Sequence, residues 1–249
     1  MRTLFSIWIW FFYGLNFFVM MWVVGLAWLV SFPFDRIRQF TNYFMFFFGK
    51  FMITVNPFWK TELIGNIPQK FTEPVIIVSN HQSFLDMPFE ALLPWTVKWI
   101  AKKSLFRVPF MGWIMALSGH LSIDRNKKLS ARSLDQQIEP MLENNVPVHI
   151  YAEGTRSKDG ELQSFKSGAF ITAKKKNCMI LPMVLDGTKD ILPSGDWRFN
   201  LRGNLKLSVL DPVYPDDFPS IKALRNHVWS MMNDELNRLR MAESEHQTV

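Results

Sequence analysis

The sequence predicts an α/β domain with a mixed sheet flanked by helices, preceded by N-terminal membrane helices. Two patterns support this fold. Residues 3–34 contain no charged side chain, and after Pro57 short β-rich runs alternate with helix-length segments. Such alternation is typical of α/β domains. We therefore expect membrane-anchoring helices over residues 1–58, a single α/β domain over residues 59–240 and a polar, frayed tail over residues 241–249.

The uncharged N-terminal segment is long enough to cross a membrane. As a helix it would extend about 48 Å, more than the roughly 30 Å of a bilayer's hydrocarbon core. A cleaved signal peptide is a competing interpretation, with a weak cleavage site at residues 25–27, but the apolar stretch continues beyond it. Basic residues cluster after the segment, from Arg36 onward, and only Arg2 precedes it. A single crossing therefore places the following domain in the cytoplasm.

The excess length, together with Gly14 and Asn16, also permits a bent helix or a hairpin that enters one leaflet, and the sequence does not choose between these arrangements. Residues 39–59 predict a second helix at or near the membrane interface, because the run 43–48 is entirely apolar or aromatic. A buried helix of the α/β domain is the alternative. A soluble core seldom needs so many consecutive phenylalanines.

Composition narrows the classes of partner. The net charge is +6, which favours anionic partners such as phosphates, anionic lipids or nucleic acid. The 10 Trp and 23 Phe are unevenly spread and are most concentrated in the first sixty residues, where they do not alternate with Lys and Arg, so lipid is favoured over nucleic acid. Cys178 is the single cysteine, which excludes an intrachain disulfide and a Cys-rich zinc site. We expect it to be a small core residue.

Each element of the α/β domain is predicted from its residue pattern. Runs rich in β-branched and apolar residues predict strands at Thr61–Gly65, Val75–Ser79, Val97–Ala101, His120–Asp124, Val146–Ala152, Met179–Leu185 and Leu205–Leu210. Longer segments with helical periodicity predict helices at Phe84–Leu93, Pro109–Leu117, Lys128–Leu142, Gly168–Lys175 and Ser220–Leu239.

A histidine and an aspartate follow the strand Val75–Ser79. His81 and Asp86 are five residues apart, so on one helix they would point about 140° apart and they meet only if the chain turns between them. In that geometry Asp86 holds one imidazole nitrogen while the other removes a proton from a hydroxyl. By itself this spacing is weak evidence, because Asp86 could simply place a charge at a helix N-terminus.

Two further strands carry polar residues at their ends. The strand Val146–Ala152 runs into Glu153–Ser157, where Gly154 permits a tight turn and Arg156 is placed for a bidentate phosphate contact. Another predicted strand ends before Arg125. Strand ends are where α/β folds place their sites, so a base and two guanidinium groups predict a site for an anionic substrate.

Four ordered blocks now make a resemblance plain: Asn80-His81-x4-Asp86, Gly119–Arg125, Tyr151–Ser157 and Ile180–Val184. Over roughly residues 60–215 the chain resembles the glycerolipid acyltransferase family, of the 1-acyl-sn-glycerol-3-phosphate acyltransferase type. The resemblance implies a domain at a membrane surface that joins a fatty acyl thioester to the hydroxyl of a lysophospholipid. Four blocks in order are far more specific than any one motif.

The resemblance also implies roles for individual residues. His81 is the general base and Asp86 its orienting partner, and the glycerol-phosphate site is formed by Arg125, Glu153, Gly154, Thr155 and Arg156. Two departures are mild. Tyr151-Ala152 stands where the family usually has Phe-Pro, and Ser122 where a large apolar residue is common. We expect neither departure to touch the chemistry, although both weaken any assignment of the acceptor.

Other candidates are more open. Lys102 and Lys103 are candidate ligands of phosphate or the oxyanion, with a solvated basic rim as the alternative. Residues 106–115 could line a groove for the acyl chain, and an ordinary core helix fits equally well. His120 and His149 are expected to be structural. No ligands are grouped at metal-site spacing, so we expect no metal and no cofactor.

The expected reaction transfers an acyl group from acyl-CoA or acyl-carrier protein to lysophosphatidic acid, giving phosphatidic acid. Direct attack by the acceptor is simpler than a covalent acyl-enzyme, because no Gly-x-Ser-x-Gly elbow occurs. The same chemistry on another lysophospholipid or an aminolipid is the alternative; a thioesterase and a non-catalytic membrane-binding protein rank lower. We expect a membrane location, specifically a bacterial inner membrane with the catalytic domain in the cytoplasm, and no nucleic-acid partner.

Overall fold

The computed structural model describes residues 1–124 and 130–247, without the side chains of residues 130–133 and 243–247. The chain divides into two compact units, which are described separately below. The first unit comprises Met1–Pro57, Gln69–Pro74 and Met87–His149. The second comprises Phe58–Pro68, Val75–Asp86 and Ile150–Val249.

The strands form a seven-stranded mixed sheet in the order β1-β7-β6-β2-β5-β3-β4. Their bounds are Trp59–Gly65 (β1), Val75–Ser79 (β2), Lys98–Lys102 (β3), Leu121–Ile123 (β4), Val148–Tyr151 (β5), Met179–Asp186 (β6) and Gly203–Val209 (β7). β1 pairs in parallel with β7, β2 with β6, and β3 with both β4 and β5, whereas β6 and β7 are antiparallel. The predicted α/β fold with a mixed sheet is confirmed, and every predicted strand is present within three residues of its expected bounds.

Burial follows position in the sheet. Every residue of β2 and of β6 is buried, as expected for continuous apolar runs covered on both faces. β1 lies at an edge and exposes Lys60, Thr61 and Glu62. Charged side chains on an edge strand discourage pairing with another chain.

The first unit contains the long N-terminal helix α1 (Arg2–Ser31) and α2 (Gln39–Thr54), which pack against each other. Among the described residues, α1 is the helix long and apolar enough to cross a membrane, and only 28% of its most apolar window is buried. That small share differs from the mostly buried core helix of a soluble protein. The Tyr13 hydroxyl donates a hydrogen bond to the Met52 carbonyl, 3.2 Å away, and thereby ties α1 to α2.

The second apolar segment forms a helix, as predicted, and it presents two different faces. One face of α2 is buried and includes Phe46, whose ring stacks 4.7 Å from that of Trp99. The other exposes Phe40, Tyr43 and Phe47. One face of α2 is therefore buried in the unit, as the alternative interpretation expects. The other face exposes aromatic side chains that a membrane could contact.

The remaining helices of the first unit are η1 (Lys103–Arg107), α4 (Met111–Leu117) and α5 (Ser130–Glu143). α4 packs against α1 and η1. It buries Gly112, Ile114 and Met115 while Phe110 and Trp113 stay exposed. Residues 106–115, which could line a groove or form an ordinary core helix, therefore contribute side chains to the core from one side only.

A buried polar cluster lies in the centre of the first unit. Lys98 is fully buried, and its ammonium donates to the carbonyl oxygens of Ser118 (2.6 Å) and Arg38 (3.0 Å). Desolvation lowers the pKa of Lys98 to about 7. His120 accepts the Trp99 backbone N–H at 3.1 Å, and His149 lies buried nearby in the same unit. Both histidines are buried, as expected for structural residues.

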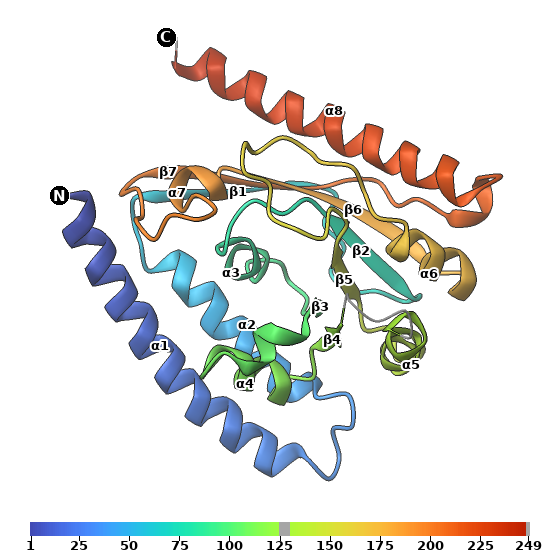
Figure 1. Cartoon of the computed structure of the whole chain (residues 1–249), viewed down its shortest axis with the longest axis horizontal. Coiled ribbons are helices and arrows are strands. Elements are labelled where there is room, and N and C mark those ends of the chain that lie inside the picture. The colour runs from blue at the N-terminus through green and yellow to red at the C-terminus, as the bar shows by residue number, and fades with distance from the viewer. Residues whose placement is uncertain (125–129, 248–249) are drawn as a thin grey trace. The chain divides into compact units, whose positions relative to one another are not determined.

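The second unit carries α6 (Gly168–Lys176), α7 (Thr188–Ile191), η2 (Pro215–Asp217) and α8 (Ile221–Gln247). α8, drawn in red in Figure 1, packs against β6 and α6. It continues to Gln247, so the predicted end of this helix at Leu239 is too early. Neither Gly nor Pro interrupts residues 221–247, and Arg240 is anchored to Glu161 at 2.7 Å.

Cys178 is buried immediately before β6, which confirms its prediction as a small core residue. Burial raises the pKa of its thiol to about 11. The thiol is therefore neutral and shielded at ordinary pH.

Candidate active site

The candidate site begins where β2 ends, at Ser79. The chain turns through the next residues before α3 (Asp86–Glu90) starts, and this turn brings the His81 imidazole back to Asp86. His81 Nδ1 lies 2.7 Å from Asp86 Oδ2. Asp86 is fully buried while the His81 side chain keeps 20% of its surface exposed. The turn that the five-residue spacing requires is therefore present, with one partner hidden and the other accessible.

The Asp86 carboxylate is held from several directions. Oδ2 also accepts the backbone N–H groups of Gln82 (2.7 Å) and Ser83 (2.9 Å), and Oδ1 accepts the Thr188 hydroxyl at 2.5 Å. These three donors hold the carboxylate in one position. A carboxylate beside Nδ1 places the imidazole proton there and leaves Nε2 as a proton acceptor. Asp86 also begins α3, so its role at a helix N-terminus coexists with its contact to His81.

Asn80 fixes the start of this turn. Its side-chain amide donates to the Leu185 carbonyl and accepts the Leu185 N–H, both at 2.8 Å. The amide thereby continues the pairing of β2 with β6 beyond Ser79, because it reproduces the donor and acceptor of a peptide unit. Ser83 Oγ adds a bond to the Leu192 carbonyl at 2.7 Å. The loop that contains His81 is thus held in place by hydrogen bonds on Asn80 and Ser83.

The segment after β5 holds the backbone of His81 on both sides. Glu153 Oε1 accepts the His81 N–H at 3.0 Å, and the Ser157 N–H donates to the His81 carbonyl at 2.8 Å. Glu153 Oε2 accepts the Gln163 N–H at 3.2 Å. Burial raises the pKa of Glu153 to about 7 despite these two backbone donors. The Tyr151–Ser157 motif therefore contacts the Asn80–Asp86 motif at the main chain of His81.

Gly154 makes the turn between these contacts. Its φ is +72°, the left-handed region that glycine tolerates best, and an added Cβ would lie within 3.1 Å of the Lys166 side chain. Thr155 and Arg156 follow in the turn with exposed side chains. Both are therefore accessible to a ligand in solution.

Tyr151 corrects an expectation. This residue was not expected to touch the chemistry, yet its ring stacks on the His81 imidazole with centroids 3.9 Å and planes 17° apart. The last position of β5 points its side chain at the turn after β2, a relationship that depends on strand pairing. Thr188 was also missed, because it is 102 residues from Asp86 in the chain.

The other predicted site residues lie elsewhere or outside the described chain. Lys102 ends β3 and Lys103 begins η1; both are exposed and belong to the first unit. Arg125 lies outside the described residues. The second unit thus brings together His81, Asp86 and the turn of Glu153–Arg156. Within residues 1–124 and 130–247, no three His, Cys, Asp or Glu side chains are grouped as a metal site requires.

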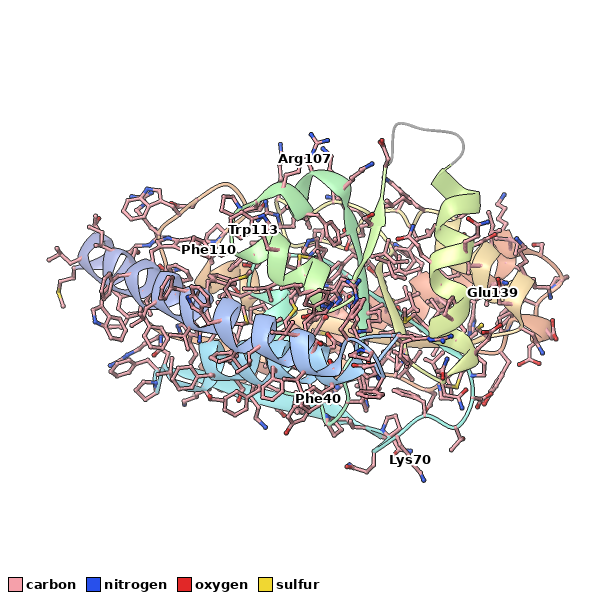
Figure 2. The ribbon with its side chains drawn as sticks, turned by 90° about the horizontal axis from the view of Figure 1, so that it is seen from below. Phe40, Lys70, Arg107, Phe110, Trp113 and Glu139 are labelled. Carbon is pink, nitrogen blue, oxygen red and sulfur yellow. The ribbon has the colours of Figure 1, made fainter. Side chains whose placement is uncertain are left out.

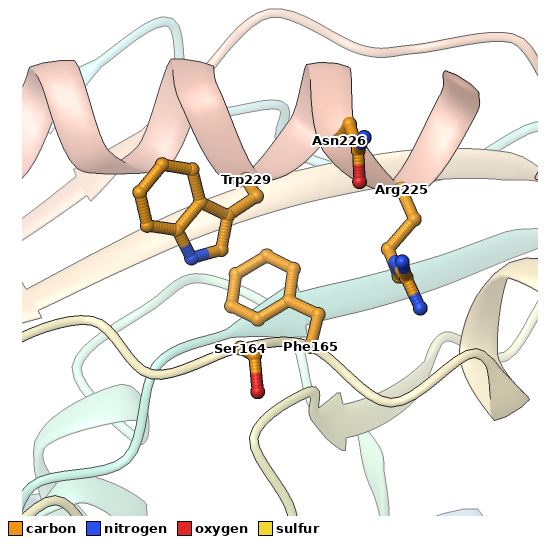
Figure 3. A pocket seen from close by; sticks show the side chains of 5 residues that line it. All are labelled: Ser164, Phe165, Arg225, Asn226 and Trp229. Carbon is orange, nitrogen blue, oxygen red and sulfur yellow. The ribbon is translucent and has the colours of Figure 1, made fainter. Parts of the chain in front are cut away.

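A pocket of about 450 Å³ lies near this turn in the second unit, between α8 and the loop before α6. Figure 3 shows its lining residues Ser164, Phe165, Arg225, Asn226 and Trp229. The Trp229 indole donates to the Gln163 carbonyl at 3.1 Å. The pocket therefore adjoins the residue whose N–H binds Glu153, and it includes none of the predicted site residues.

The chain is similar to known proteins in sequence and in fold. A family model described as Acyltransferase matches residues 60–186. The chain is 32% identical over 201 residues to a chloroplastic 1-acyl-sn-glycerol-3-phosphate acyltransferase of Arabidopsis thaliana, covering 80% of this chain and 55% of the relative. It is 39% identical over 143 residues to the 1-acyl-sn-glycerol-3-phosphate acyltransferase of Helicobacter pylori, covering 57% and 60%.

The fold also matches a solved structure, the 1-acyl-sn-glycerophosphate (LPA) acyltransferase PlsC from Thermotoga maritima. The TM-score is 0.78 at 27% sequence identity, and the match covers 96% of this chain and 98% of the other. The chain spans about half the length of the plant relatives it matches. The matched region contains His81, Asp86 and the turn of Glu153–Arg156, and the chain belongs to the acyltransferase family.

Proposed function

We propose that the protein transfers a fatty acyl group from an acyl thioester to the free hydroxyl of lysophosphatidic acid and so makes phosphatidic acid. The observation that carries the proposal is the 2.7 Å contact between His81 Nδ1 and the buried Asp86 carboxylate. It leaves His81 Nε2 as a base in a partly exposed position. The relatives named above, whose names describe this activity, support the choice of acceptor.

The reaction proceeds in two steps. As the acceptor hydroxyl attacks the thioester carbonyl, His81 Nε2 takes its proton, a C–O bond forms and the carbonyl becomes an oxyanion. When the tetrahedral intermediate collapses, the C–S bond breaks and the imidazolium returns the proton to the departing thiolate. Asp86 stabilises the imidazolium between these steps without itself taking the proton. The chemistry requires no cofactor, because the acyl group arrives already activated.

The acceptor's phosphate is bound by cations and by the turn after β5. Arg125 and Arg156 supply guanidinium groups, and Glu153, Gly154 and Thr155 complete the glycerol-phosphate site. Lys102 and Lys103 serve as further ligands of phosphate or oxyanion. Glu153 acts chiefly through the His81 backbone, since its oxygens accept two main-chain N–H groups.

The donor is coenzyme A or acyl-carrier protein loaded with a fatty acyl chain, and α1 keeps the enzyme in the membrane, where the lysophosphatidic acid acceptor and the phosphatidic acid product reside. The expected setting is a bacterial inner membrane with the catalytic domain in the cytoplasm. The same machinery on another lysophospholipid or an aminolipid is the second candidate, because Arg156 would serve a phosphodiester as well as a phosphomonoester.

The test is acyl transfer by the detergent-solubilised protein from labelled acyl-CoA to lysophosphatidic acid. His81→Ala should abolish transfer, whereas His227→Ala, which removes an exposed histidine of α8, should not. A panel of other lysolipids identifies the acceptor. Equal transfer by His81→Ala would overturn the mechanism, and thioester hydrolysis unaffected by added lysolipid would identify a thioesterase instead.

A further inference from the structure

The η1–α4 segment (residues 103–117) exposes apolar side chains to an unusual degree. η1 buries none of its residues. Four large apolar side chains of the segment are 39–46% exposed: Leu105, Val108, Phe110 and Trp113. Scattered exposed apolar residues are normal, but a contiguous group of this kind marks an interaction surface.

The backbone holds these side chains outward. Phe110 precedes α4 with φ +59° and ψ −69°, a conformation that a bulky residue rarely adopts. Gly112 permits the tight return of the chain, because a Cβ there would lie 2.4 Å from the Leu105 carbonyl oxygen. The exposure of Phe110 is therefore built into the turn between η1 and α4.

The exposed group continues the apolar face of α1. The ring of Phe110 lies 6.3 Å from that of Phe18 on α1, in an edge-to-face arrangement, and Phe18 in turn lies 6.3 Å from Trp22. Phe18 is 49% and Trp22 69% exposed. Figure 2 shows Phe110 and Trp113 beside α1, with Arg107 on η1. One apolar surface thus extends from the N-terminal helix onto η1–α4.

The charge around this surface has one sign. Lys102, Lys103 and Arg107 are all exposed. Residues 91–123 contain no Asp or Glu, so no acidic side chain from this stretch neutralises them. Basic residues beside Trp and Phe are the composition of protein surfaces that lie at the headgroup level of anionic bilayers.

We infer that η1–α4 is a membrane-docking element, which lays Phe110 and Trp113 into the interfacial region of a bilayer beside α1 and holds anionic lipid headgroups with Arg107. The inference goes beyond the proposed function, because acyl transfer and insertion of α1 do not require it. A lipid surface fits better than an acidic protein partner, since the cations border an apolar surface that continues along α1.

A probe at residue 113 tests the inference without substrate. Cys178 is buried with a raised thiol pKa, so Trp113→Cys offers a selective site for an environment-sensitive fluorophore. Trp197→Cys is the matched control, because Trp197 is 48% exposed in the second unit and Trp113 46% in the first. Both labelled proteins are reconstituted into phosphatidylcholine vesicles with and without phosphatidylglycerol and with doxyl-labelled lipid.

The expected result is a blue-shifted emission and doxyl quenching at position 113 and neither at position 197. Arg107→Gln, which removes one positive charge, should raise the phosphatidylglycerol fraction needed for half of the blue shift by about fivefold. Equal responses at 113 and 197 would overturn the inference. So would a response at 113 only to acyl-CoA, which would assign the segment to an acyl groove, or only to an acidic protein. If Trp113→Cys misfolds, Leu105→Cys takes its place with the same criteria.

Discussion

Tyr151 lies flat against His81, with ring centroids 3.9 Å apart and planes 17° apart. Asp86 restrains the imidazole through Nδ1, and Tyr151 restrains it through its face. The two contacts together limit rotation of a side chain that is otherwise partly exposed. A base must be positioned as well as basic, because small misplacements of the reacting atoms cost rate.

Removing the stacked ring should slow the chemical step. We expect Tyr151→Ala to lower kcat by about tenfold, with little change in KM for the acceptor, because the base loses orientation while the substrate contacts remain. Tyr151→Phe keeps the ring and should stay close to the parent enzyme. A loss in KM alone, or an equal loss in Tyr151→Phe, would contradict a role of the ring in positioning His81.

The Asp86 carboxylate should matter nearly as much as the base. Asp86→Asn keeps the size of the side chain but offers an amide where His81 Nδ1–H and two backbone N–H groups need an acceptor. We expect kcat to fall by about 10²–10⁴-fold, the range that a positioned base supplies. Steady-state rates measure this, with circular dichroism and the melting temperature as controls for folding. Near-normal turnover would show that Asp86 acts only at the N-terminus of α3 and does not support His81.

Glu153 should make the free energy of unfolding fall as the pH rises between its unfolded and folded pKa values. Its pKa is about 7 in the folded protein against an ordinary value of 4.5, so between these values the folded state binds more protons than the unfolded state. The contribution of this group is fully present below about pH 4.5 and is lost as the pH rises through 7. The free energy of unfolding, measured across this window, should fall more steeply in the parent protein than in Glu153→Gln. Parallel curves would contradict the raised pKa.

Lys98 should make the free energy of unfolding rise with pH, in a pH range above that of Glu153. Burial lowers its pKa from 10.5 to about 7, so between these values the unfolded state binds more protons. The free energy of unfolding should therefore gain a positive slope with pH from about 7 to 10.5. Lys98→Met removes that slope, although it leaves the Arg38 and Ser118 carbonyls without their donor. Denaturant titrations at several pH values measure both effects, and an unchanged slope in the variant would contradict the assignment to Lys98.

The order of elements followed from local pattern. Apolar runs such as Val75–Ser79 and Met179–Asp186 are buried strands because their side chains leave no polar face to expose. The helix after residue 220 extends beyond its predicted end at Leu239, because good helix formers continue to Gln247. Helix propensity there outweighs polarity.

The α/β order and the apolar N-terminal helix are readable from the sequence, because each depends on periodicity, and the four ordered motifs single out His81 and Asp86 as a pair. The contacts of Thr188 and Tyr151 with these two residues, and the hold of the Glu153–Ser157 turn on the His81 backbone, come from the tertiary structure. It also decided which face of α2 is buried. These contacts join strands and loops that are tens of residues apart, and only the pairing of β-strands and the packing of helices bring such segments together.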